Sequence, residues 1–136
     1  MTLKRVLVVD DNPINLKLAM LMLAPEHCVV STATTARIAL DLLRKEGTDL
    51  LLLDLQLPDM DGLALTRLLR AEPAFAHLPI VAVTAYAMKG DEEKARAAGV
   101  DAYITKPVAK EQFRRVVASF LNKGVDDEQQ RRASKP

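Results

Sequence analysis

Three acidic residues, a threonine and a lysine each stand at or just past the end of a short apolar run: Asp10, Asp11, Asp54, Thr84 and Lys106. Carboxylate oxygens are the ligands that a hard divalent cation such as Mg²⁺ prefers. Three carboxylates, one such cation and one lysine ammonium sum to zero charge. This balance suits the reversible addition of a phosphoryl group to one acid, which adds roughly −1.5 to −2 charge.

Apolar runs and helical patterns alternate along the chain and predict the elements that would position these residues. Strands are expected at 6–9, 28–31, 50–53, 79–84 and 102–105, and helices at about 13–24, 35–45, 63–70, 89–98 and 110–122. This alternation predicts an α/β protein with a doubly wound, five-stranded parallel sheet and helices on both faces. Ligand sites in such sheets lie beyond the carboxyl ends of the strands. The candidate residues are therefore expected to converge on one edge of the sheet.

Each residue also has a purely structural interpretation. Asp10 or Asp54 alone would suit a strand-end cap, and Thr84 alone would suit an ordinary turn. Their combination on matching strand ends, together with the lysine, favours the functional interpretation. Asp59 and Asp61, in the loop after the third predicted strand, are expected to be turn and N-cap residues rather than metal ligands.

The composition is that of one globular domain. Of the 136 residues, 49% are hydrophobic and 27% are charged, which argues against disorder. We expect a folded domain at 1–123 and a flexible polar tail at 124–136. The net charge of +1 argues against a nucleic-acid-binding protein. The single cysteine, Cys28, excludes an intramolecular disulfide and a cysteine-rich zinc site.

Four motifs carry a resemblance to a known family. They read Val-Val-Asp-Asp-Asn at 8–12, Leu-Leu-Asp-Leu-Gln-Leu-Pro-Asp-Met-Asp-Gly at 52–62, Val-Thr-Ala at 83–85 and Tyr-Ile-Thr-Lys-Pro at 103–107. Their order and their places on the predicted strand ends resemble the receiver domain of two-component response regulators, the CheY-like family. The resemblance implies a flavodoxin-like (βα)5 fold with strand order 2-1-3-4-5. The stretch at 85–92 further resembles stand-alone cell-cycle regulators of the DivK type.

The resemblance implies a role for each residue around the metal. Asp54 becomes the phosphoryl acceptor, and the donor is a phosphohistidine of a histidine kinase or of a histidine phosphotransfer protein. Asp10, Asp11, Asp54 and the backbone carbonyl of Gln56 become the protein ligands of Mg²⁺, with Asp11 the more direct ligand of the first pair. Gln56 and Tyr86 occupy positions where the family tunes hydrolysis of the acyl phosphate.

Other residues are implied to bind the phosphoryl group and to report its arrival. Thr84, with the adjacent Ala85, and Lys106 would contact phosphoryl oxygens, and the bond between Lys106 and Pro107 would be cis. Movement of Thr84 would let Tyr103 rotate inward, although Tyr103 could equally serve only in packing. The fourth helix, fifth strand and fifth helix form the usual output surface, which could also support a phosphorylation-dependent homodimer.

The first predicted helix is apolar on more than one side. One stripe consists of Ile14, Leu18, Leu21 and Met22, and the other consists of Leu16, Met20 and Leu23. One stripe must pack on the sheet. We expect the stripe of Leu16, Met20 and Leu23 to be a partner surface beside Asp54, where the family docks a helical bundle of the kinase. The alternative is that the sheet and a neighbouring helix cover both stripes.

The leading interpretation is a stand-alone response regulator: a Mg²⁺-dependent phosphorylation switch that biases kinases and is not an enzyme acting on a metabolite. Its apolar stretches are too short for a membrane span, and its N-terminus lacks a signal-peptide pattern, so we expect a cytoplasmic protein without membrane or nucleic-acid partners. The start at Met1 and the polar tail favour an independent chain.

Two alternatives remain. The chain could act as a phosphorelay intermediate, or it could be a receiver taken from a hybrid kinase or a longer regulator. A different class is the Mg²⁺-dependent phosphohydrolase of the haloacid dehalogenase type. Its signature requires a second aspartate two residues after the nucleophile on the first strand. Here Asp10 is followed by Asp11, Asn12 and Pro13, so that spacing is missing.

Overall fold

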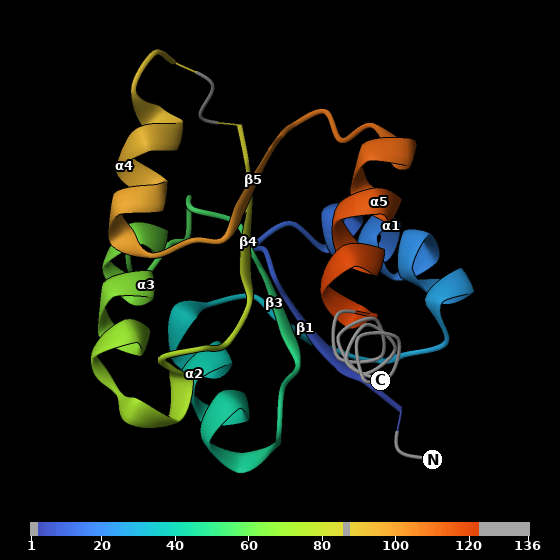
Figure 1. The fold of residues 1–136 in the computed structure, drawn as a ribbon, viewed down its shortest axis with the longest axis horizontal. Coiled ribbons are helices and arrows are strands. Elements are labelled where there is room, and N and C mark those ends of the chain that lie inside the picture. Colours follow the sequence, from blue (N-terminus) through green and yellow to red (C-terminus); the bar gives the residue numbers. More distant parts are fainter. Residues whose placement is uncertain (1–2, 86–87, 123–136) are drawn as a thin grey trace, which may run out of the picture.

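Five strands alternate with five α-helices along residues 3–85 and 88–122, the part of the chain that the computed structural model describes. The strands are β1 (Arg5–Val9), β2 (Val29–Ala33), β3 (Leu50–Leu53), β4 (Ile80–Thr84) and β5 (Ala102–Thr105). The helices are α1 (Pro13–Leu23), α2 (Ala36–Lys45), α3 (Gly62–Ala71), α4 (Asp91–Ala98) and α5 (Lys110–Leu121), with short 3-10 helices η1 (Ala24–Glu26) and η2 (Pro73–Phe75). Neighbouring strands are parallel in the order β2-β1-β3-β4-β5, which confirms the predicted flavodoxin-like topology (Figure 1).

The central strands are buried on both faces, and their side chains alternate between two hydrophobic clusters. Leu7 and Leu51 belong to the cluster that packs against α2, α3 and α4. Val6 and Leu50 belong to the cluster that packs against α1 and α5. The two helical layers lie on opposite sides of the sheet (Figure 1). Burial on both faces explains why these strands are continuous apolar runs in the sequence.

The observed elements differ from the predicted ones at β2 and α4. β2 covers Val29–Ala33 instead of 28–31, because its register with β1 pairs Val29 with Arg5 and Ala33 with Val9. Polar residues in this strand are tolerated because it lies at the edge of the sheet. α4 begins at Asp91 rather than at residue 89, because Gly90 has a φ of 91° and lies outside the helical region.

The structure decides which side of α1 faces the sheet. Leu16 and Leu23 are 8% and 0% exposed and pack in the cluster beneath α1 and α5. The expectation that these two residues form a partner surface is therefore wrong, because helical periodicity alone could not distinguish the two apolar stripes. Met20, the third member of that stripe, is exposed. The exposed large apolar side chains of α1 are Ile14, Leu18, Met20 and Leu21.

Two predictions concern parts of the chain that lie outside the described residues. These are the role of Tyr86 in hydrolysis and the flexible polar tail at 124–136, and both stay predictions. Within the described ranges, no helix combines the length and the apolar character needed to cross a membrane.

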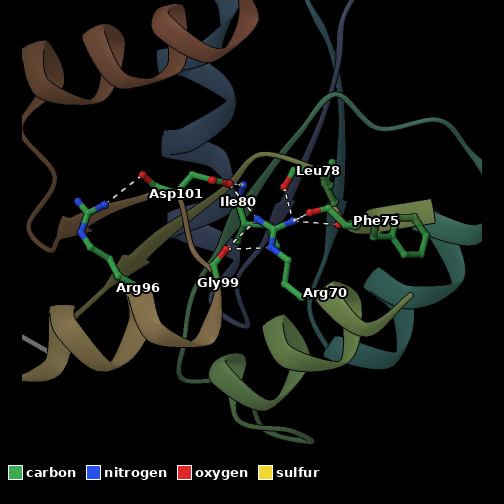
Figure 2. Close-up of polar contacts among 8 residues, drawn as sticks. Arg70, Phe75, Leu78, Ile80, Arg96, Gly99 and Asp101 are labelled. Atoms are coloured by element: carbon green, nitrogen blue, oxygen red, sulfur yellow. Dashed lines mark hydrogen bonds and ion pairs between the residues drawn. The ribbon is translucent and has the colours of Figure 1, made fainter. Parts of the chain in front are cut away.

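At the amino ends of β4 and β5, Arg70 of α3 joins segments that are distant in sequence (Figure 2). Its guanidinium donates hydrogen bonds to the carbonyl oxygens of Leu78 and Gly99, each at 2.7 Å, and to the carboxylate of Asp101 at 2.9 Å. Asp101 also accepts a hydrogen bond from the N–H of Ile80 at 2.8 Å. The planar guanidinium is suited to this role because it presents several donors in a fixed geometry. Arg70 thereby ties α3 to β4 and to the α4–β5 turn.

Arg70→Ala is expected to lower the free energy of unfolding by about 2 kcal/mol, because partly buried carbonyl groups and Asp101 lose their donor. Arg70→Lys should recover only part of this loss, since an ammonium cannot reproduce the guanidinium fork. Urea unfolding followed by circular dichroism measures both variants. Arg67→Ala removes an exposed arginine of the same helix and should change stability by less than about 0.5 kcal/mol. A loss at Arg70 no larger than the loss at Arg67 would contradict the assigned role.

Candidate functional site

Asp10 and Asp54 lie side by side at the carboxyl end of the sheet. Val9 and Leu53 are partners in the pairing of β1 with β3, so the next residue on each strand is one of these aspartates. The N–H of Asp54 donates to the carbonyl of Val9 at 2.9 Å, and the N–H of Asp10 donates to the carbonyl of Ala33 at 3.0 Å. Both aspartates are buried. The register of the strands therefore brings two buried carboxylates together.

Lys106 offsets part of this negative charge. It follows β5, and its backbone N–H donates to the carbonyl of Thr84 at 2.8 Å. Its Nζ lies 2.9 Å from Oδ2 of Asp10 and 3.0 Å from Oδ2 of Asp54. Burial disfavours the charged lysine, but its hydrogen bonds and ion pairs with both carboxylates outweigh that effect and raise the pKa of Lys106. The peptide bond between Lys106 and Pro107 is cis, as expected.

Amide groups orient the two buried carboxylates. Oδ1 of Asp10 accepts from the N–H of Asn12 at 2.9 Å and from Nδ2 of Asn15 at 3.5 Å, and Oδ1 of Asp54 accepts from the N–H of Gln56 at 3.0 Å. Burial raises the pKa of Asp54, although the Gln56 amide and Lys106 act in the opposite direction. The negative charge of Asp10 adds to the rise. The surroundings of Asp54 therefore disfavour its ionised form, chiefly through burial.

Asp11 completes a cluster of three carboxylates. One oxygen from each of Asp10, Asp11 and Asp54 lies within 4.8 Å of the other two, and Asp11 is exposed whereas the other two are buried. Together with Lys106 the cluster carries two net negative charges, which one divalent cation would neutralise. An all-oxygen donor set with one solvent-exposed side fits Mg²⁺, which keeps several of its waters. The structure thus brings the three predicted acidic ligands together. The backbone N–H of Gln56 contacts Asp54, and the role of the Gln56 carbonyl as a metal ligand stays a prediction.

Comparison with known proteins identifies the family. Residues 6–118 match the response regulator receiver domain. The chain belongs to this family. Over 118 residues, which cover 87% of this chain and 96% of the relative, it is 40% identical to the polar-differentiation response regulator DivK of Brucella ovis. Receiver domains are signalling proteins, and the predicted likeness to DivK-type regulators is confirmed.

Solved receiver structures share the architecture. A CheY-like receiver domain protein of Methanospirillum hungatei is 31% identical, with a TM-score of 0.82, and the match covers 93% of this chain and 99% of that one. The receiver domain of a sensor histidine kinase of Pseudomonas aeruginosa is 30% identical, with a TM-score of 0.79, over 88% of this chain and 98% of that one. That structure holds a magnesium ion in its active site cleft. Receiver domains bind Mg²⁺ at the acidic pocket that Asp10, Asp11 and Asp54 form here.

The remaining predicted residues of the receiver pocket lie on β4, on β5 and just beyond β4. Thr84 is the last residue of β4 and is buried, whereas Ala85 is exposed. Tyr103 of β5 is half-buried and packs against the cluster that faces α2, α3 and α4. Burial raises the pKa of Tyr103, and the charges of Asp91 and Glu92 at the start of α4 add to the effect. The tyrosine therefore lies on the α4 side of the sheet.

Two acids in the loop after β3 do not join the metal cluster of the receiver. Asp61 is the N-cap of α3, as expected, and its Oδ1 accepts from the N–H of Leu63 at 2.8 Å. Asp59 caps a different helix: its two oxygens accept from the N–H groups of Ala36 and Arg37 in α2, at 2.9 and 3.1 Å. These hydrogen bonds, the one from Ala36 above all, lower the pKa of Asp59. The sequence gives no local signal for this cap, because 23 residues separate Asp59 from Ala36.

A cavity of about 300 Å³ lies beside the receiver site. Leu18 and Met22 of α1 and Phe113 of α5 form part of its apolar wall. Its polar lining consists of Asp10, Asn15, Asp54 and Lys106. Asn15 was not predicted as a site residue, because its only signal in the sequence is its position one turn after the helix-capping Asn12. The cavity therefore reaches the carboxylate of Asp54.

Asp54→Asn is expected to raise the free energy of unfolding at neutral pH without divalent metal, because it removes a charge that burial disfavours. Because the pKa of Asp54 is higher in the folded chain than its ordinary value of 3.8, the folded chain binds the Asp54 proton more tightly than the unfolded chain does. The stabilisation that this proton provides is complete below pH 3.8 and is lost as the pH rises through the folded pKa. The gain of the variant should therefore shrink on acidification. Urea unfolding in EDTA at neutral pH and at about pH 4 measures this difference.

The matched control for this experiment is Asp41→Asn, which removes an exposed carboxylate of α2 and should change stability little at either pH. An Asp54→Asn variant that is less stable than the wild-type chain at neutral pH would contradict the account.

Proposed function

We propose that this chain is a single-domain response regulator that accepts a phosphoryl group on Asp54 from a phosphohistidine of a histidine kinase or of a histidine phosphotransfer protein. The observation that carries the proposal is the shared contact of Lys106 Nζ with Asp10 and Asp54 at the carboxyl end of the sheet. A match over 96% of the length of DivK supports a stand-alone role. A cytoplasmic location belongs to the same proposal.

The transfer uses Asp54 as the nucleophile. One carboxylate oxygen of Asp54 forms a bond to phosphorus, the P–N bond to the donor imidazole breaks, and the imidazole keeps the bonding electron pair and takes a proton from solvent. Asp10, Asp11, Asp54 and the Gln56 carbonyl would hold Mg²⁺, which supplies charge neutralisation for the transferring oxygens. Lys106 Nζ exchanges its present carboxylate contacts for a hydrogen bond to a phosphoryl oxygen. Hydrolysis of the acyl phosphate later resets the chain.

Thr84 and Tyr103 convert this local charge change into a change of surface. The Thr84 hydroxyl and the backbone at Ala85 bind further phosphoryl oxygens, and the movement of Thr84 makes space for the ring of Tyr103. The half-buried position of Tyr103 on the α4 side of the sheet supports this sequence of events. Couplings of this kind are typically about 1–3 kcal/mol, so phosphorylation biases the α4–β5–α5 face without locking it. That face is the proposed surface for a phosphorylation-dependent homodimer.

The exposed apolar side of α1 is the proposed docking surface for the phosphohistidine donor. Ile14 and Leu21 are 67% and 70% exposed. Leu18, which is 50% exposed, also lines the cavity that reaches Asp54. A donor helix packed on these side chains would place its histidine beside the acceptor. This surface takes the place of the one expected from Leu16 and Leu23, and Met20 remains part of it.

Incubation with acetyl phosphate and Mg²⁺ is expected to add one phosphoryl group to the chain, measured as intact-protein mass. Asp54→Asn should abolish the adduct because the nucleophile is missing, and EDTA should abolish it because the carboxylate cluster loses its counter-charge. Asp41→Asn serves as the matched control and should be labelled like the wild type. An adduct that persists on Asp54→Asn would contradict the proposal, and so would the absence of labelling by both acetyl phosphate and a phosphorylated kinase.

The double variant Ile14→Ser/Leu21→Ser is expected to slow transfer from a phosphorylated histidine kinase by about tenfold, which corresponds to about 1.4 kcal/mol of lost apolar contact. Labelling by acetyl phosphate should stay unchanged, because neither residue contacts the site. Ile38→Ser, which removes an exposed isoleucine of α2, is the control. Equal transfer rates for the double variant and the control would contradict the proposal that the donor docks on α1.

A further inference from the structure

The β3–α3 loop, residues 54–61, is held firmly at both of its ends. At its start, Oδ1 of Asp54 accepts from the N–H of Gln56. At its close, the N–H of Gly62 donates to the carbonyl of Leu55 at 2.9 Å, and Gln56 pairs with Asp61 in an isolated antiparallel bridge. A Cβ on Gly62 would lie only 2.5 Å from the Cα of Leu55, so the two backbone segments approach as closely as a glycine allows.

Between these ends, the middle of the loop is attached to the rest of the chain by contacts of two kinds. Leu57 and Met60 pack partly against the hydrophobic cluster, and such contacts have no preferred direction. Asp59 makes directional contacts, because its two carboxylate oxygens accept from the N–H groups of Ala36 and Arg37 at 2.9 and 3.1 Å. These donors belong to the first turn of α2, where Ala36 is fully buried in the same cluster. Asp59 therefore fixes the loop to a helix that is itself fixed on the sheet.

We infer that Asp59 is a positioning residue for the metal site: by holding the β3–α3 loop on the N-terminus of α2, it places the backbone carbonyl of Gln56 where Mg²⁺ can use it. Asp59 lies three positions after Gln56, inside the segment that the Gln56–Asp61 bridge closes, so releasing Asp59 loosens the peptide segment that leads away from the Gln56 carbonyl. The inference rests on the proposed function, in which Gln56 is a metal ligand. Asp59 itself is not a ligand, since its carboxylate is engaged by α2 and lies outside the Asp10, Asp11 and Asp54 cluster.

The chain provides a matched control on the same helix. Oγ1 of Thr35 accepts from the N–H of Ile38 at 3.1 Å and is the regular N-cap of α2. Thr35→Ala and Asp59→Ala each remove a cap from α2 and should each lower its stability. Only Asp59→Ala also releases the β3–α3 loop. A purely structural role for Asp59 would therefore make the two variants behave alike toward Mg²⁺.

The test is calorimetric titration of the full chain with Mg²⁺ in the absence of any phosphoryl donor. Asp59→Ala is expected to raise the dissociation constant for Mg²⁺ about tenfold, the usual effect of losing a group that orients a metal ligand. Thr35→Ala should change it less than about twofold, although thermal unfolding shows a comparable loss of stability. Titrations at low and high salt separate positioning from the loss of a negative charge, because salt screens only the latter.

Asp59→Asn keeps one acceptor and should give an intermediate dissociation constant; it carries the test if Asp59→Ala does not fold. Binding of Mg²⁺ by Asp59→Ala with the wild-type affinity overturns the inference, as does a loss of affinity that disappears at high salt. An equal loss of affinity in Thr35→Ala also overturns it, because the effect would then follow from helix stability alone. A wild-type chain that does not bind Mg²⁺ overturns the proposed function, and the inference falls with it.

Discussion

Three carboxylates confined to one edge of a parallel sheet form the constraint on which the rest of this structure depends. The pairing of β1 with β3 makes Asp10 and Asp54 neighbours, and both are buried, so their repulsion is only weakly screened by water. Lys106, which follows the edge strand β5, offsets one of the negative charges through contacts with both acids. The excess charge that remains explains why a divalent cation fits the site. In the proposed function, a phosphoryl group on Asp54 would add to this excess and would draw Lys106 away from its present contacts.

The two ends of the sheet have different physical characters. At the carboxyl ends of the strands, charges are crowded and unbalanced. At the amino ends, Arg70 satisfies several backbone carbonyls and Asp101 within one closed network (Figure 2). Gly99 and Asp101, which flank the turn from α4 into β5, are held by that network. In the proposed function, a change of charge at the carboxyl ends would alter the start of α4 and the end of β5, while the Arg70 network anchors the end of α4 and the start of β5.

The fold and the central cluster could be predicted because one sequence pattern, an apolar run followed by a polar residue, locates both a buried strand and a site residue at its end. A run such as Leu50–Leu53 identifies a strand buried on both faces, and the polar residue that follows it must then lie at the edge of the sheet. The covered side of α1 could not be predicted, because a helix that is apolar around most of its circumference carries no directional signal. The partners of Asp59 and Arg70 were equally hidden. Their hydrogen bonds join segments that only the folded layers bring together: Ala36 and Asp59 lie 23 positions apart in the sequence, and Arg70 and Asp101 lie 31 positions apart.

The most direct test of this account is a crystal structure of the chain with Mg²⁺ and beryllofluoride, an analogue of the phosphoryl group. We expect a beryllofluoride adduct on an oxygen of Asp54. We also expect a metal ion about 2.0–2.1 Å from ligands drawn from Asp10, Asp11, Asp54 and the Gln56 carbonyl. Lys106 Nζ should contact a fluorine of the adduct. An unmodified Asp54 that keeps its contact with Lys106, or a metal ion bound away from the three carboxylates, would contradict the account.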